Sequence, residues 1–182
     1  MSERATPELL ISASEIANRV DELASEIARI CGPDPLVVAV LKGSFVFTAD
    51  LLRALHRHGV HPQIDFMTLS SYGTSKESRG EVEVVRDITD EVSGRTVLLI
   101  DDILESGRTL AFAKELLGGR GARSVACCVL LDKPGKRKVE LEADFVGFVS
   151  PDKFVVGYGL DFAHRYRELP FIGFLPPDGE DG

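Results

Sequence analysis

Near the start of the chain, apolar residues recur at the spacing of an α-helix. Five of them, separated by alternating steps of four and three, share one helical face: Ile16, Val20, Leu23, Ile27 and Ile30. Ser12 and Glu15 have the spacing of a capping box before this face, and Gly32 followed by Pro33 comes after it. The pattern therefore predicts an amphipathic helix that begins after Ser12 and ends at Gly32.

Further along the chain, the pattern changes to short, continuous apolar runs rich in β-branched residues. Three of these runs predict strands that are buried on both faces of a parallel sheet: residues 36–41, 96–100 and 124–131. Residues 64–69 predict another strand, and residues 81–86 alternate charged and apolar side chains, as a half-exposed edge strand does. We expect helices over residues 45–55 and 110–117, and a mobile polar loop over residues 70–80. Strands that alternate with helices indicate right-handed βαβ units, and hence an open α/β sheet flanked by helices.

Composition narrows the classes of partner. The 182-residue chain has a formal net charge of −8, which argues against broad binding to nucleic acid or to an anionic membrane, because both favour a basic face. Three cysteines, two of them the neighbours Cys127 and Cys128, predict buried, reduced thiols. No apolar leader opens the chain, and no uncharged apolar run approaches about 20 residues. We therefore expect a single cytoplasmic domain over residues 1–182 that binds neither nucleic acid nor membrane.

Residues 96–110 carry the clearest chemical signal. A buried strand leads to the adjacent acids Asp101 and Asp102, and in open α/β sheets ligands bind at this carboxyl end. The turn over residues 105–109 opens a helix, so it presents backbone N–H groups and two hydroxyls to an anion. Carboxylates beside the turn suit sugar hydroxyls, because each oxygen pair accepts several hydrogen bonds. These residues predict a phosphate at the turn and a ribose at the acids.

The same residues are also compatible with other interpretations. A strand that ends in two acids before a helix can be an ordinary βα unit without a ligand. Paired Asp residues at a strand end also hold Mg²⁺ in response-regulator receivers, but a receiver needs a phosphoacceptor Asp at another strand end, and no position stands out for it. The pattern GxxxxGK[ST] is absent from the sequence, which argues against an ordinary P-loop NTPase.

Residues 97–110, Val-Leu-Leu-Ile-Asp-Asp-Ile-Leu-Glu-Ser-Gly-Arg-Thr-Leu, resemble the phosphoribosyl-diphosphate (PRPP) binding motif of type I phosphoribosyltransferases. Four further segments resemble the 6-oxopurine branch of that family, the hypoxanthine phosphoribosyltransferases: residues 41–44, 70–73, 130–134 and 145–161. The segments occur in the family's order along most of the chain. The PRPP motif identifies the superfamily, and Pro-Asp-Lys-Phe-Val-Val-Gly-Tyr-Gly-Leu-Asp over residues 151–161 narrows the resemblance to the 6-oxopurine branch.

The resemblance implies a type I phosphoribosyltransferase fold, with a core over about residues 36–150 and a small hood built from the N-terminal and C-terminal segments. It also implies purine salvage, in which the 5-phosphoribosyl group of PRPP is transferred, with Mg²⁺, to N9 of hypoxanthine and of guanine. The products are IMP or GMP and pyrophosphate. Family members are commonly homodimers or homotetramers, so self-association is expected.

The resemblance implies roles for the residues that match the family's sugar- and phosphate-binding positions. Asp101 and Asp102 would hold the ribose hydroxyls and, with Asp161, lie beside the metal. The loop that binds the 5′-phosphate would consist of Glu105, Ser106, Gly107, Arg108 and Thr109. Pyrophosphate would be bound by Lys42, Gly43 and Arg167, and family members have a non-proline cis peptide bond before this lysine.

The purine side is matched by four residues, namely Lys133, Phe154, Val155 and Asp161. Lys133 would donate to the 6-oxo group, which favours hypoxanthine and guanine over adenine. Phe154 would stack on the base, and the backbone of Val155 would contact its Watson–Crick edge. Ser71 and Tyr72 match a lid that closes over the reactants and keeps water out.

Glu105 departs from the family, which commonly has an Asp near N7 of the purine at this place. Glutamate keeps the carboxylate and adds a methylene, so a small backbone or rotamer change must absorb its reach. We expect Glu105 to be the general base that takes the N7 proton.

Two other functions remain compatible with the resemblance. One is a transferase that prefers guanine or xanthine, and the other is a PRPP- or purine-sensing regulator that keeps the fold but binds nucleic acid. The acidic charge and the absence of an added helix-turn-helix segment count against a regulator. A carboxylate at position 105 favours an enzyme.

Overall fold

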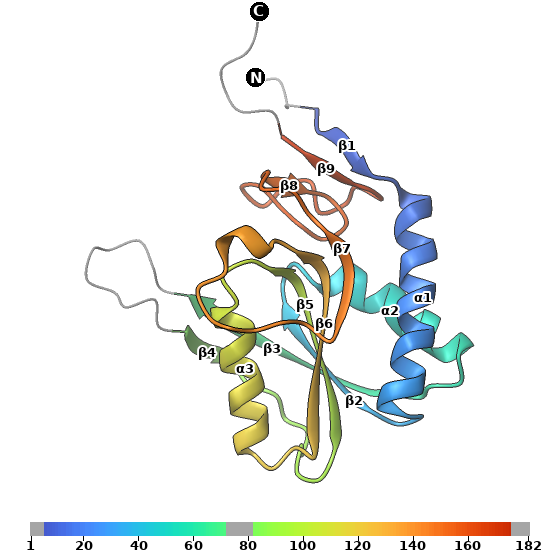
Figure 1. Ribbon diagram of the computed structural model, residues 1–182, viewed down its shortest axis with the longest axis vertical. Helices are drawn as coiled ribbons and strands as arrows, with labels where there is room; N and C mark the ends of the chain where they lie inside the picture. The colour runs from blue at the N-terminus through green and yellow to red at the C-terminus, as the bar shows by residue number, and fades with distance from the viewer. Residues whose placement is uncertain (1–5, 72–81, 176–182) are drawn as a thin grey trace, which may run out of the picture.

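The computed structural model of the chain describes residues 6–71 and 82–175. Its main sheet has six strands in the order β4–β3–β2–β5–β6–β7: β2 (Leu36–Leu41), β3 (Gln63–Ser71), β4 (Val82–Arg86), β5 (Thr96–Leu104), β6 (Ser124–Asp132) and β7 (Phe145–Val149). Five strands run parallel, and β4 pairs antiparallel with β3 at one edge (Figure 1). The predicted open, mainly parallel sheet is confirmed.

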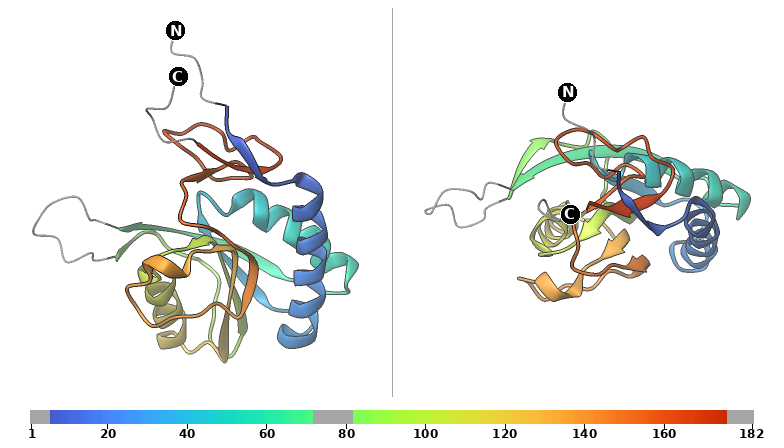
Figure 2. Two further views of the ribbon diagram at one scale, coloured as in Figure 1. Left: turned by 45° about the horizontal axis from the view of Figure 1, so that its top comes forward. Right: turned by 90° about the horizontal axis from the view of Figure 1, so that it is seen from above.

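Helices cover both faces of this sheet. The helices α1 (Ala13–Cys31) and α2 (Phe45–Arg57) pack on one face, and α3 (Arg108–Gly119) packs on the other (Figures 1 and 2). Alternate residues of β2 belong to different layers, because Val37 and Ala39 contact the α1–α2 side while Val38 and Val40 contact the α3 side. This burial on both faces explains the continuous apolar runs in the sequence.

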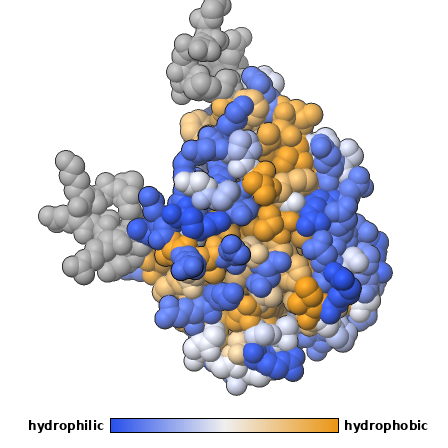
Figure 3. Space-filling model, in the orientation of Figure 1, coloured by the Kyte–Doolittle hydropathy of each residue, from blue (hydrophilic) through white to orange (hydrophobic). Residues whose placement is uncertain are grey.

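The capping box at the start of α1 is formed as predicted. The Glu15 N–H donates to Ser12 Oγ at 3.3 Å, and the Ser12 N–H donates to Glu15 Oε2 at 2.8 Å. The outer surface of α1 is mostly hydrophilic (Figure 3), as expected for an amphipathic helix. The placement of Ile30 on the buried face was wrong, because Ile30 is 66% exposed and Cys31 is buried instead. At about 100° per residue, these two positions lie at opposite edges of the apolar face, and the sheet covers the Cys31 edge.

A second, smaller sheet joins the two ends of the described chain. It has the order β1 (Glu8–Ile11), β9 (Ile172–Phe174) and β8 (Val155–Val156), all antiparallel. We call this sheet, with the connection between β8 and β9, the hood. It lies beyond the end of the main sheet (Figures 1 and 2), so the terminal segments form the predicted hood. A short 3-10 helix, η1 (Pro134–Lys136), follows β6.

The state of the cysteines agrees with the sequence. All three cysteines are free and buried. None of the helices in the described part of the chain is both long enough and apolar enough to cross a membrane.

The α1 residue Arg19 binds to the exposed edge of the sheet at β7. Its Nε donates to Gly147 O at 3.1 Å and its Nη2 donates to Val146 O at 2.8 Å. The Nη1 atom pairs with Glu22 and Glu26, at 2.9 Å each. Arg19 thus satisfies carbonyl groups of an edge strand and anchors α1 to it.

Arg19→Met should lower the free energy of unfolding by about 1–3 kcal/mol, because it leaves two backbone carbonyls without charge-assisted donors. Urea unfolding followed by circular dichroism measures this change. Arg29→Met is the matched control, since Arg29 lies exposed in the last turn of the same helix, and its effect should stay within about 0.5 kcal/mol. Equal effects of the two substitutions would contradict the role of Arg19.

Candidate active site

The two acids are held inside a strand. The sequence placed the end of this strand near Ile100, but β5 continues to Leu104 and stays paired with β6 through Asp101 and Ile103. The Asp102 N–H donates to Asp101 Oδ1 at 2.9 Å, and the Ile103 N–H donates to Asp102 Oδ1 at 2.7 Å. The main chain therefore fixes the orientation of both carboxyl groups.

Burial disfavours negative charge on both acids. Asp101 is 7% exposed, and its burial together with the neighbouring Asp102 charge raises the pKa of Asp101 well above its ordinary value. Burial also raises the pKa of Asp102, although hydrogen bonds and the positive charge of Arg167 oppose this rise. A ligand that brings hydroxyl donors or positive charge would stabilise the charged forms of the pair.

Two glycines allow three segments to meet at these acids. The peptide bond between Leu41 and Lys42 is cis, and the loop after it brings Gly43 against Asp102. A Cβ atom on Gly43 would lie 1.5 Å from Asp102 Oδ2, and one on Gly159 of the hood would lie 2.4 Å from Gly43 O. Side chains at these positions would separate the segments, so glycine is needed at both.

The first of two cavities at this place has a volume of about 310 Å³, and we call it the loop-side cavity. It is lined by residues 40–43, 69, 101–107, 109 and 110. It brings together both acids and most of the residues predicted to bind phosphates, namely Lys42, Gly43, Glu105, Ser106, Gly107 and Thr109. Arg108, the first residue of α3, is exposed and does not line this cavity. The N-terminus of α3 opens directly from the loop, which suits an anion.

The second cavity, of about 300 Å³, lies on the hood side of the first, and we call it the hood-side cavity. Its lining consists of Asp102, Ile103, Glu105, Lys133, Lys136, Asp152, Lys153, Phe154, Val155, Leu160 and Asp161. All four residues predicted to contact a purine are in this set. Asp102, Ile103 and Glu105 line both cavities, so the two spaces adjoin at these residues.

The hood-side cavity is lined by a buried lysine and by an exposed phenylalanine ring. Lys133 is 7% exposed, and its Nζ donates to Lys153 O at 2.7 Å. The Phe154 side chain is 55% exposed, and its ring meets the ring of Phe162 edge-on at 5.5 Å between centroids. Phe154 lines the hood-side cavity, and its high exposure shows that it is not a core residue. Such a ring is available for stacking.

Arg167 is connected to the hood-side cavity through its ion pair with Asp161. Its Nη2 pairs with Asp161 Oδ1 at 2.7 Å, and its Nη1 donates to Gly159 O at 2.6 Å. The other oxygen of Asp161 accepts from the His164 N–H at 2.8 Å. Arg167 lines neither of the two cavities, although its charge acts on Asp102.

Two basic residues near Glu105 were not among the site residues predicted from the sequence. Lys136 Nζ lies 3.3 Å from Glu105 Oε1 and 2.7 Å from Asp152 Oδ1. Arg137 donates to Glu105 O at 3.1 Å and pairs with Asp132 at 2.5 Å. Both follow the matched segment 130–134 directly, so the basic run after Lys133 and Pro134 was the available signal.

The predicted lid can be placed only in part. Ser71 is the last residue of β3, and Tyr72 lies outside the described residues.

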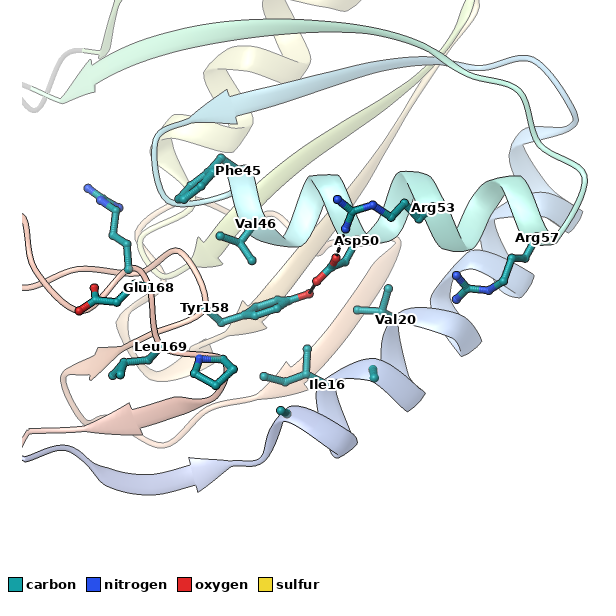
Figure 4. A pocket seen from close by; sticks show the side chains of 14 residues that line it. Ile16, Val20, Phe45, Val46, Asp50, Arg53, Arg57, Tyr158, Glu168 and Leu169 are labelled. Carbon is teal, nitrogen blue, oxygen red and sulfur yellow. Dashed lines mark hydrogen bonds and ion pairs between the residues drawn. The ribbon is translucent and has the colours of Figure 1, made fainter.

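A larger cavity, of about 650 Å³, lies between α1, α2 and the connection from β8 to β9 (Figure 4). Three of its polar groups pair with one another, because the Tyr158 hydroxyl donates to Asp50 Oδ2 at 2.8 Å and Arg53 pairs with Asp50 Oδ1 at 2.7 Å. Arg167 also lines this cavity. Most of the remaining wall is apolar, with Ile16 and Val46 among its residues. This cavity is larger than the two cavities at the acids. The carboxylates, the lysines and the anion-binding turn that could take part in a reaction nevertheless converge at the carboxyl end of β5.

Comparison with known proteins gives a consistent set of relatives. Residues 11–163 match the family model described as a phosphoribosyl transferase domain. The chain is 48% identical over 170 residues to the hypoxanthine-guanine phosphoribosyltransferase of Bacillus subtilis, which covers 93% of each chain. It is 50% identical over 171 residues to the bifunctional protein TilS/HprT of Listeria monocytogenes, and this match covers 93% of the chain and 26% of that protein. The chain thus spans about a quarter of the length of this bifunctional relative.

A solved structure extends the similarity to three dimensions. The hypoxanthine-guanine phosphoribosyltransferase of Bacillus anthracis superposes with a TM-score of 0.87 at 43% identity. The match covers 95% of this chain and 100% of that one.

Asp101→Asn should stabilise the ligand-free protein at pH 8 and have little effect near pH 4. The folded pKa of Asp101 is raised, so its contribution to stability is full below the unfolded pKa and is lost as pH rises through the folded pKa. Asparagine keeps the Oδ1 acceptor for the Asp102 N–H and carries no charge. We expect a gain of at least about 1 kcal/mol at pH 8, or about 2–4 °C in Tm.

Thermal unfolding from pH 4 to pH 8 in the presence of EDTA measures this gain. The control is Asp34→Asn at an exposed position, which should change Tm at pH 8 by at most about 1–2 °C. A lower Tm for Asp101→Asn at pH 8 would show that burial does not oppose the Asp101 charge.

Proposed function

Because the chain belongs to the phosphoribosyltransferase family, we propose that it transfers the 5-phosphoribosyl group of PRPP to N9 of hypoxanthine, and of guanine as well. The products are IMP or GMP and pyrophosphate, which makes the chain a purine salvage enzyme. The observation that carries this proposal is the junction of the two cavities at Asp102 and Glu105. One cavity has acids and an anion-binding loop, the other has a buried lysine and an exposed ring, and the reacting bond would lie between them.

The loop-side cavity would hold the sugar and its phosphates. Residues 106–109 would bind the 5′-phosphate through backbone N–H groups, with Arg108 contributing its main chain at the start of α3. The ribose hydroxyls would donate to Asp101 and Asp102, and the negative field of these acids would favour the positive charge that develops on the sugar. Pyrophosphate would lie at Lys42 and Gly43. Arg167 would also contact it, and its ion pair with Asp161 would then be partly replaced by this new contact.

The acids at this junction fit a Mg²⁺ ion that is bound mainly through its substrate. In the described part of the chain, no group of three or more His, Cys, Asp or Glu side chains converges as a metal cage. Mg²⁺ commonly uses one or two carboxylates together with substrate phosphates, and Asp101, Asp102 and Asp161 border the cavities where PRPP would lie. When bound, the ion would neutralise negative charge on the departing pyrophosphate.

The hood-side cavity would hold the purine. Lys133 Nζ uses one N–H for Lys153 O and keeps two for the 6-oxo group. Adenine carries an amino group there, which would face the ammonium without an acceptor. Phe154 would stack on the base, and the backbone of Val155 in β8 would contact its Watson–Crick edge.

Glu105 would act as the general base. When N9 bonds to C1 of the ribose, the bond from C1 to the pyrophosphate oxygen breaks and pyrophosphate leaves with the electron pair. The purine then gains positive charge, and the Glu105 carboxylate takes the proton from N7. The position of this side chain at the border of both cavities supports the assignment.

Three further expectations concern the protein in its surroundings. Ser71 and Tyr72 would belong to a lid that keeps water from the sugar. The chain would assemble as a homodimer or homotetramer, as the family resemblance implies. It would work in the cytoplasm, which is consistent with three free, buried thiols.

Pyrophosphate release from PRPP should occur with hypoxanthine and guanine, and it should stop when EDTA removes Mg²⁺. The rate with adenine should be lower by a factor of about 10³ or more, because Lys133 would face a donor. A coupled pyrophosphate assay with hypoxanthine, guanine, xanthine and adenine measures this. Turnover with adenine alone, or with none of the four bases, would refute the proposed activity.

Glu105→Gln should lower kcat by a factor of about 10²–10⁴, because the variant keeps the shape of the side chain but cannot accept the N7 proton. The KM for PRPP should change little. Glu140→Gln is a matched control, since Glu140 is exposed and lines neither of the two cavities at the acids. Full turnover in Glu105→Gln, with PRPP binding intact, would remove Glu105 from the mechanism.

A further inference from the structure

Lys136 connects two walls of the hood-side cavity. Its ammonium lies 3.3 Å from Glu105 Oε1, on the loop after β5, and 2.7 Å from Asp152 Oδ1, on the segment before β8. All three residues line the cavity. Both carboxylates raise the pKa of Lys136, so its ammonium stays charged throughout the neutral range.

The turn that carries Lys136 is fixed to the phosphate loop by its main chain. The Lys138 N–H donates to Ser106 O at 2.9 Å, and the Val139 N–H donates to the same oxygen at 3.3 Å. The Arg137 side chain adds a bond from its Nη1 to Glu105 O at 3.1 Å. At the start of the same turn, the Lys133 N–H donates to Leu104 O at 2.9 Å. The backbones at 105 and 136 are therefore held at a constant separation, and their side chains meet across it.

The length of the Glu105 side chain matches this separation. Its side chain is 43% exposed, so without a partner it would sample several rotamers. Aspartate is shorter by one C–C bond, about 1.5 Å, and an aspartate carboxylate at 105 would be withdrawn from Lys136 by up to this length. A glutamate at this position can reach the ammonium without a shift of the loop.

We propose that Lys136 is a positioning residue, which holds the Glu105 carboxylate at the junction of the two cavities, and that Asp152 holds Lys136 in turn. This inference rests on the proposed role of Glu105 as the general base. When Glu105 takes a proton, its attraction to Lys136 weakens, and the shorter pair with Asp152 keeps the ammonium in place. The side chain can then lose its proton and return to the same position.

The contribution of Lys136 can be separated from stability. The three side chains are between 43% and 66% exposed, and ion pairs at such positions contribute little to folding. Lys136→Met should therefore leave the urea midpoint unchanged. It should lower kcat for hypoxanthine by about 10- to 100-fold, because misplacing a catalytic group by about 1 Å costs that much. The KM for PRPP should change less than twofold.

A double-mutant cycle tests whether Lys136 acts through Glu105. We expect Lys136→Met to lower kcat in the wild-type background and to cause no further loss in Glu105→Gln, because the group that it positions is already inactive. Lys136→Arg should restore most of the activity, and Asp152→Asn should cause a smaller loss of kcat in the same direction. Lys138→Met, at an exposed lysine two residues along, should behave as wild type.

The outcomes separate this inference from the proposed function. Normal kcat in Lys136→Met, with Glu105→Gln impaired, would overturn the positioning role and leave the base intact. Additive losses in the double variant would show that Lys136 acts independently of Glu105, and would also overturn it. Full activity of Glu105→Gln would overturn both the base and the positioning residue. If Lys136→Met unfolds, Lys136→Gln and Asp152→Asn provide the same comparison with smaller changes.

Discussion

Two adjacent carboxyl groups, the buried Asp101 and the half-buried Asp102, lie at the carboxyl end of β5, and the arrangement around the candidate site depends on them. Their main-chain hydrogen bonds fix both side chains, while burial opposes charge on each. Gly43 gives Asp102 its space, and Gly159 brings the hood against the loop that contains Gly43. A sugar that donates hydroxyl hydrogen bonds and develops positive charge would stabilise this pair in its charged form. Such a ligand would offset the cost of keeping these charges away from water in the free protein, a common compromise between stability and function.

The segment after β6 organises the other side of the site. Residues just after the short helix η1 form main-chain hydrogen bonds to the loop after β5, and three cations of this segment have different partners. Lys133 binds the backbone at Lys153, Lys136 binds Glu105 and Asp152, and Arg137 binds Asp132 and the Glu105 carbonyl. One turn therefore contributes side chains to the hood-side cavity and is also held against the loop after β5. It connects the cavity wall at Lys133 with Glu105, the proposed general base.

Several parts of the fold could be predicted from local patterns. The α1 cap at Ser12, the strands β2, β5 and β6, and the edge strand β4 all have signals that depend on near neighbours in sequence. Ile30 was misplaced because periodicity gives the direction of a helix face but not which of its edges meets the sheet. The end of β5 was placed too early, because its ladder with β6 continues past the apolar run. Lys133, Phe154 and Asp161 in the hood-side cavity were found only through the resemblance, since they have no chemical signal of their own.

By itself, the sequence determined the order of helices and strands from α1 to β6, because spacing and residue type act over a few positions along the chain. Residue types at 101–109 predicted a site for sugar and phosphate, and the family resemblance supplied the residues proposed to bind a purine. The tertiary structure decided which groups meet across long separations in sequence: Asp102 with Gly43, Gly43 with Gly159, and Lys136 with Glu105 and Asp152. It also decided that Asp101 is buried and Asp102 half-buried, and this removal from water raises the pKa of both carboxyl groups. Burial and charge pairing depend on all surrounding segments at once, and no local pattern records them.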